Sequence, residues 1–256
     1  LHNEARARSL LQSFGFSNWK SARSILLQLE SRAGHNLTGL FSHLLAAVGA
    51  AADPQRALVN FERLVDNFGS AIYPELQKTP RVIEILVTLF SISPFLTEIL
   101  LRTPDGLDLL QNRQSLTERK TIGQFQTEAV TAFQSAITDK GQLDALRRYQ
   151  RRQLLRIGTS DFLDLYDLRS VLSQLSRMAT GLVRACLVLA ARQTKIPAEG
   201  FAVLAMGKLG GWELNYSSDI DLIYCYDGEQ GHTVRGDHGN SSSWVGSLPS
   251  PEFFIR

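Results

Sequence analysis

Cysteine is nearly absent from this sequence, which has two examples, Cys186 and Cys225, among 256 residues. They lie far apart and form no Cys-x-x-Cys pair, so their spacing does not indicate a disulfide framework. Few cysteines and no such framework are typical of proteins from reducing compartments, and we expect an intracellular, cytoplasmic location.

An excess of charge of one sign is missing, and so is a long uninterrupted apolar run. The formal net charge is +2, so electrostatics favour neither nucleic acid nor a membrane surface as a partner. The most apolar stretch, residues 82–101, contains Glu84, Pro94 and Glu98, which favour paired helices over a membrane span. With 44% hydrophobic and 20% charged residues, the composition is that of a globular protein with one large domain or two smaller ones.

Helical signals fill the chain up to about residue 195. Apolar residues recur at helical spacing from Leu58 to Phe68, and a capping residue followed by proline precedes several such stretches. Residues 143–157 form a basic helix that we expect Gly158 to end, and residues 168–193 form the longest helix, with Cys186 on its apolar stripe. The start signals are Asp53-Pro54, Thr79-Pro80, Ser93-Pro94 and Thr103-Pro104.

The pattern changes after Lys195, where a strand over residues 201–206 is followed by a glycine turn, a short helix and a second strand over residues 220–226. Residues 227–250 are rich in Gly, Ser and His and predict a loop, and a helical pattern restarts at Ser250, so we expect a fragment of a longer chain. The sequence therefore predicts an α+β protein with an all-helical region over 1–195 and a second region over 196–256.

Two carboxylates, Asp219 and Asp221, are the main candidates for chemistry. Residues two apart on a strand point to the same face, so both should project together while Ile220 and Leu222 enter the core. Adjacent carboxylates repel each other and are stabilised by a divalent cation such as Mg²⁺, which binds one or two carboxylates together with substrate phosphate oxygens. The pair is therefore predicted to be catalytic and metal-binding.

A phosphate site is predicted just before these carboxylates. Gly210 and Gly211 lack Cβ, so their N–H groups can approach a phosphate, and a helix starting after them would add its positive end. Lys208 would supply a charge, and Ser217 and Ser218 would supply hydroxyl donors.

The string Gly-Lys-Leu-Gly-Gly-x-Glu-Leu-Asn-x-Ser-Ser-Asp-Ile-Asp-Leu-Ile from Gly207 resembles the bacterial bifunctional glutamine synthetase adenylyltransferase/adenylyl-removing enzyme family. The resemblance implies a partial polymerase-β-like nucleotidyltransferase domain over 196–256, and it implies glutamine synthetase, ATP, ADP and phosphate as substrates or partners. A nitrogen-signalling regulatory protein is a further implied partner. Family members attach AMP to a tyrosine of glutamine synthetase with one copy of the domain and remove it by phosphorolysis with another.

The residues of the motif match the removing copy more closely than the attaching copy. The matching residues are Met206, Asn215 and Ile220 together with the paired serines. Trp212 departs from the family, which more often has a small or polar residue there. Such sites usually take a third metal-binding carboxylate from a later strand. In this family that strand resembles Val-Asp-Leu-Arg-Leu-Arg-Pro. That strand is not present after Asp221, so we expect the isolated chain to turn over no substrate.

Other interpretations stay open. The chain could be another nucleotidyltransferase, or a non-catalytic helical scaffold that binds glutamine synthetase or a nitrogen-signalling protein. His232, Asp237 and His238 lack ligand spacing and are predicted to be solvated loop residues. Five arginines are predicted to form a solvated helix face rather than a contact with nucleotide or partner. They stand at positions 147, 148, 151, 152 and 156.

Overall fold

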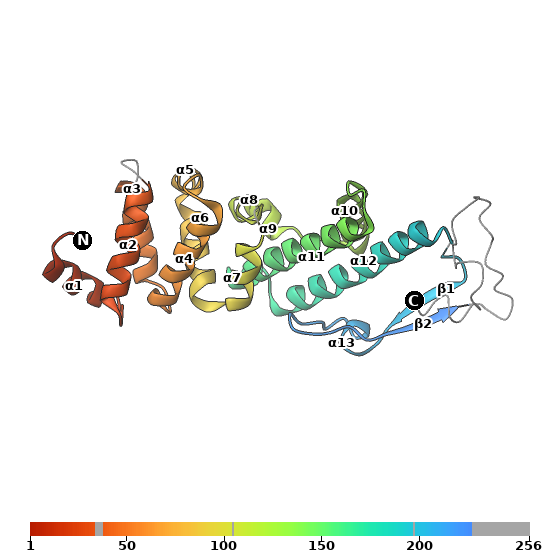
Figure 1. Cartoon of the computed structure of the whole chain (residues 1–256). Coiled ribbons are helices and arrows are strands. Elements are labelled where there is room, and N and C mark those ends of the chain that lie inside the picture. Colours follow the sequence, from red (N-terminus) through yellow and green to blue (C-terminus); the bar gives the residue numbers. More distant parts are fainter. Residues whose placement is uncertain (34–37, 104, 197, 227–256) are drawn as a thin grey trace. The chain divides into compact units, whose positions relative to one another are not determined.

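The computed structural model describes residues 1–33, 38–103, 105–196 and 198–226. Helices dominate this part of the chain, and a two-stranded sheet follows them in the sequence (Figure 1). Packing divides the chain into two compact units. The first contains Leu1–Glu118 and Leu154–Tyr166, and the second contains Arg119–Gln153 together with the residues from Asp167 onward.

The first unit is built from short helices, several of which start at the capping signals of the sequence, whereas the helix expected after Thr103 begins at Gly106 and Thr79 makes no side-chain capping bond. Asp53 accepts a hydrogen bond from the N–H of Arg56, and Ser93 accepts one from the N–H of Leu96, with proline in the first turn each time. Its helices are α1 (Glu4–Ser13), α2 (Trp19–Ala33), α3 (Thr38–Gly49), α4 (Pro54–Phe68), α5 (Ile72–Lys78), α6 (Pro80–Ile92), α7 (Pro94–Leu101), α8 (Gly106–Gln111), α9 (Arg113–Thr117) and the end of α11 (Asp139–Phe162).

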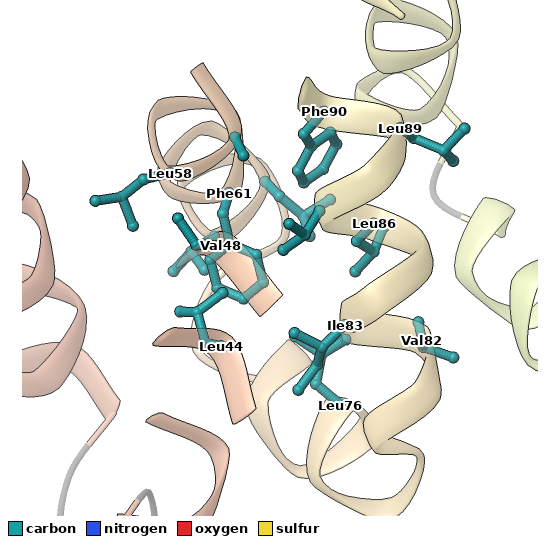
Figure 2. Close-up of a cluster of buried hydrophobic side chains, with 14 of the residues drawn as sticks. Leu44, Val48, Leu58, Phe61, Leu76, Val82, Ile83, Leu86, Leu89 and Phe90 are labelled. Carbon is teal, nitrogen blue, oxygen red and sulfur yellow. The ribbon is translucent and has the colours of Figure 1, made fainter. Parts of the chain in front are cut away.

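Apolar side chains from α1 to α8 form one core in the first unit, and α3, α4, α5 and α6 surround part of it. Phe61 and Phe90 are fully buried there, and Leu86 lies between the same helices (Figure 2). Burying a large apolar side chain contributes about 1.5–3 kcal/mol. The apolar residues that recur at helical spacing in the sequence therefore form this core, and they come from several helices rather than from one.

Two expectations for α11 are wrong. Gly158 does not end this helix, which continues to Phe162. A Cβ at Gly158 would lie 2.7 Å from a methyl carbon of Leu96, so the glycine permits close packing within a helix. Arg156 is 1% exposed rather than solvated, and its guanidinium donates to the carbonyl of Glu118 at 2.6 Å and to the hydroxyl of Tyr166 at 2.8 Å.

In the second unit, α10 (Ile122–Gln134) crosses closely over α12 (Leu168–Thr194). A Cβ at Gly181 would lie 2.6 Å from the Cβ of Phe125 and 3.0 Å from the backbone nitrogen of Gln126, so only glycine permits this approach. Phe125 and Ala185 are fully buried. Cys186 is exposed, contrary to the prediction, because the buried face of α12 follows Ala185 and Leu189.

A polar network stabilises the same unit. The ammonium of Lys120, a residue 7% exposed, donates to both carboxylate oxygens of Glu128 at 2.7 Å. The hydroxyl of Tyr149 donates to the same carboxylate at 2.9 Å. Gln174 on α12 holds the backbone of Lys120 through two hydrogen bonds of 2.9 Å.

Replacing Glu128 with leucine should destabilise the second unit by about 2 kcal/mol, because removal of the carboxylate leaves the ammonium of Lys120 charged in a largely dry site. Urea unfolding of the chain, followed by hydrogen exchange of residues 119–153, measures the loss. The double variant Glu128→Leu, Lys120→Met is the control and should recover at least half of it. Equal losses in both variants would contradict this account of the network.

The remaining elements of the second unit are β1 (Phe201–Ala205), α13 (Gly207–Gly210) and β2 (Leu222–Tyr226). The second unit thus contains elements on both sides of residue 195. The predicted domain boundary between residues 195 and 196 stays a prediction. Among the described residues, no helix has the length and apolarity to cross a membrane. The α+β class is confirmed at the level of helices plus a small sheet.

Candidate functional site

The site is built on an antiparallel pair of strands. In β1 and β2, Phe201 pairs with Tyr226 and Ala205 pairs with Leu222. The N–H of Met206 donates to the carbonyl of Asp221 at 2.9 Å, so hydrogen bonding continues one residue beyond the strands. Asp221 is thereby fixed to the residue just before α13.

Asp219 and Asp221 lie immediately before β2, which begins at Leu222 instead of the predicted residue 220. Both carboxylates are exposed. Leu222 is half-buried, whereas Ile220 is 39% exposed, so the prediction that Ile220 enters the core is wrong. Ile220 precedes the strand and does not continue its alternation, since the ladder ends at Asp221.

The carboxylate of Asp221 lies over the first residue of α13. A Cβ built at Gly207 would be 3.3 Å from Asp221 Oδ2, and Gly207 has a φ of +52°, a conformation that glycine adopts without strain. The structure therefore brings one predicted carboxylate directly against the start of the glycine turn. This closeness is the main geometric fact about the site.

The glycine turn differs from its predicted form. The helix α13 ends at Gly210, and no helix begins after the glycine pair within the described residues up to 226. The N–H of Gly210 donates to the carbonyl of Met206 and that of Gly211 to the carbonyl of Gly207, both at 3.0 Å. These two N–H groups stabilise the turn itself and would have to leave it to bind a phosphate.

Packing explains the glycine at position 210. A Cβ there would lie 2.5 Å from the carbonyl oxygen of Ala205, which real Cβ atoms do not tolerate. At Gly211 the nearest atom, in the side chain of Glu213, is 3.4 Å away. The first glycine is thus required by the turn from β1 into α13, and the second is not.

The other predicted phosphate-binding residues lie on the same loop. Lys208 is exposed, and its carbonyl accepts from the N–H of Glu213 at 2.9 Å, which closes the loop. Ser218 is half-buried and its hydroxyl donates to Asn215 Oδ1, while Ser217 is exposed. Lysine, hydroxyls and carboxylates therefore share one exposed loop and strand end.

Trp212, the departure from the family motif, has a positive φ of +60° and is 49% exposed. Few residues with a Cβ adopt this conformation, and glycine or asparagine would adopt it more readily. The sequence marked this position as unusual but did not predict its backbone.

Sequence reasoning missed the attachment of the loop to α12. Leu209 and Leu214 are 4% and 5% exposed, and the N–H of Leu214 donates to the hydroxyl of Ser176 at 3.2 Å. In Figure 1 the blue segment that carries α13 runs alongside α12. Leucines in a glycine-rich loop were a signal for anchoring, but nothing marked Ser176 in a long helix.

Oxygen ligands at Asp219 and Asp221 suit Mg²⁺ in type, since it prefers carboxylates completed by water and phosphate oxygens. Within residues 1–226, the described ranges bring together no cluster of three His, Cys, Asp or Glu side chains that could hold a metal. The predicted third carboxylate stays a prediction, and His232, Asp237 and His238 lie outside the described residues.

A groove of about 540 Å³ lies elsewhere in the second unit, lined by the C-terminal half of α12 and the residues after it. Its lining includes the apolar residues Leu187, Val188 and Ile196, and Arg184 and Lys195 also line it. It contains none of the predicted site residues. The carboxylates are exposed instead, and the closeness of Asp221 Oδ2 to Gly207 rather than a cavity marks the candidate site.

Residues 83–248 match the family model described as glutamate-ammonia ligase adenylyltransferase. A protein of Shewanella loihica called bifunctional glutamine synthetase adenylyltransferase/adenylyl-removing enzyme is 34% identical over 197 residues, which are 70% of this chain and 19% of the relative. A protein of the same name from Thioalkalivibrio sulfidiphilus is 29% identical over 280 residues, 98% of this chain and 28% of the relative. The match thus spans about a fifth of the length of one relative and more than a quarter of the other.

Proposed function

The chain belongs to the glutamate-ammonia ligase adenylyltransferase family, and on that premise we propose that it takes part in regulating glutamine synthetase by nucleotidyl transfer. The observation that carries this proposal is the position of Asp221 Oδ2 against Gly207, at the start of the motif's glycine turn. The substrates we propose are a tyrosine-bound AMP on glutamine synthetase, phosphate and ADP, or ATP in the opposite direction.

Each residue of the loop has a role in this proposal. Asp219 and Asp221 would hold Mg²⁺, which would neutralise negative charge on the phosphate oxygens at the reacting phosphorus. Lys208 would attract the phosphate chain as a point charge, and Ser217 and Ser218 would donate hydroxyl hydrogen bonds to it. Gly210 and Gly211 would form the turn against which the phosphates lie. No nucleophile from the protein is needed, since substrates supply the attacking oxygen.

We propose removal of AMP as the direction of this copy. An oxygen of hydrogen phosphate would attack the phosphorus of the tyrosyl-AMP, and the bond from that phosphorus to the tyrosine oxygen would break. The proton of the hydrogen phosphate would pass to the tyrosine oxygen, so that ADP and the tyrosine hydroxyl result. The residue identities in the motif support this direction, because Met206, Asn215 and Ile220 match the removing copy.

Release of ADP tests the direction. The full-length protein, given adenylylated glutamine synthetase and phosphate, should produce ADP in a reaction that requires both phosphate and Mg²⁺. The same protein given unmodified glutamine synthetase and ATP provides the comparison for the attachment reaction. ADP release that does not depend on phosphate, or that is unchanged without Mg²⁺, contradicts the proposal.

Binding to the isolated chain separates an enzyme site from a scaffold. We expect calorimetric titration to detect Mg²⁺ and ADP binding that weakens when Asp219 is replaced by asparagine. A chain that binds glutamine synthetase but neither Mg²⁺ nor ADP would be the scaffold. Glu199, an exposed carboxylate before β1, provides the matched control as Glu199→Gln.

A further inference from the structure

Ser176 on α12 makes a direct hydrogen bond to the loop of residues 206–221, which lies far from it in the sequence. Its hydroxyl oxygen accepts from the N–H of Leu214 at 3.2 Å, and the side chain is fully buried. Leu214 itself is 5% exposed. A buried backbone N–H needs an acceptor, and Ser176 supplies it where the loop has neither helix nor strand partners.

The hydrogen bond from Leu214 to Ser176 lies between the two parts of the loop that carry the proposed site residues. Leu214 separates two turns, one closed by the bond from the Glu213 N–H to the Lys208 carbonyl at 2.9 Å, the other by Ser218 and Asn215. The first turn carries the proposed phosphate-binding residues, and the second leads into the carboxylates. Leu209 and Leu214 are the two buried residues between 201 and 226, so they fix the loop to the helix surface.

We propose that Ser176 is a positioning residue for the nucleotidyltransferase site, which holds the glycine turn and the Asp219–Asp221 segment at their working separation. This inference rests on the proposed function for its catalytic consequence. Its structural half, the dependence of the loop on Ser176, stands independently of that function. The residue touches neither substrate nor metal and acts through the backbone of Leu214.

The first measurement is hydrogen exchange in the chain itself. Replacing Ser176 with alanine removes the acceptor, so exchange at the Leu214 amide should accelerate at least about tenfold, and peptides covering residues 209–219 should lose protection. Thr180→Ala is the matched control, because it removes a hydroxyl from the same helix, one that donates to the backbone carbonyl of Ser176. Unchanged exchange at Leu214 in Ser176→Ala overturns the proposal, whatever the activity.

The second measurement is kinetic and uses the full-length protein. Small displacements of reacting groups cost catalysis more than binding, so Ser176→Ala should lower kcat about tenfold, leave KM for adenylylated glutamine synthetase within twofold and raise the Mg²⁺ concentration for half-maximal rate. Ser176→Thr, which keeps the hydroxyl, should restore kcat to within threefold. Thr180→Ala should behave as the unchanged protein.

The outcomes separate this inference from the proposed function. If Asp221→Asn abolishes activity and Ser176→Ala leaves kcat within twofold despite faster exchange at Leu214, the positioning role is wrong and the site assignment stands. If Asp221→Asn leaves activity unchanged, the proposed function is wrong, and the exchange measurement alone decides whether Ser176 holds the loop. A fall in the folded fraction of Ser176→Ala that accounts for the whole loss of apparent kcat, with KM unchanged, would show a purely structural role and overturn positioning.

Discussion

Replacing Asp221 with asparagine is expected to lower phosphate-dependent ADP release at least about 10³-fold, since loss of a metal carboxylate removes several kcal/mol of transition-state stabilisation. Asp219→Asn should have an effect of the same order. Both carboxylates are exposed, so neither change should alter the free energy of unfolding by more than about 0.5 kcal/mol. Single-turnover assays of the full-length protein measure the rates.

The attachment of AMP to glutamine synthetase provides an internal control, because we propose that another copy of the domain performs it. It should stay within a few-fold of the unchanged protein in both variants, as should both reactions in Glu199→Gln. Variants that still release ADP but no longer attach AMP would reverse the direction proposed for this copy. Retention of both reactions within a few-fold would show that these carboxylates hold no catalytic metal.

Replacing Gly210 with alanine is the second change with a large expected effect. The added Cβ would lie 2.5 Å from the carbonyl oxygen of Ala205, and backbone cannot move away as a flexible side chain can. The turn must therefore shift, and a shift of about 1 Å in the loop costs about 10²-fold in rate. We also expect the second unit to lose about 2 kcal/mol of stability from overpacking.

Gly211→Ala is the matched control for stability. Gly211 has an ordinary helical conformation, with φ of −78° and ψ of −2°, and its nearest neighbour atom lies 3.4 Å from the added Cβ. Its unfolding free energy should stay within about 0.5 kcal/mol of the unchanged chain. Hydrogen exchange over residues 201–226 measures both variants, and equal protection in the two would contradict the packing explanation of Gly210.

The helices were predictable because their signals are local. Asp53 and Ser93 cap helices where a capping residue precedes proline, and apolar periodicity placed Phe61 in the core. Gly158 and Arg156 were not predictable, since their surroundings come from residues far along the chain. A glycine that ends one helix and a glycine that permits packing in another look the same in a sequence.

The candidate site was predictable in its residues and less so in its geometry. The motif identified Asp219 and Asp221, and the strand predicted beside them lies there, although the sequence did not predict that both are exposed. The N–H groups of Gly210 and Gly211 donate within the turn because α13 ends at Gly210. The end of a helix of only four residues could not be predicted from the sequence. The exposed Ile220 shows the same limit, because the strand begins two residues later than its β-propensity suggests.

Binding of Mn²⁺ as a paramagnetic substitute for Mg²⁺ tests the central claim, that Asp219 and Asp221 hold a divalent cation beside the glycine turn. Electron paramagnetic resonance of the full-length protein with ADP present should detect Mn²⁺ that Mg²⁺ displaces. That binding should fall at least about tenfold in Asp219→Asn and in Asp221→Asn, and it should be unchanged in Glu199→Gln. Equal Mn²⁺ binding at this copy in all four proteins would contradict the account.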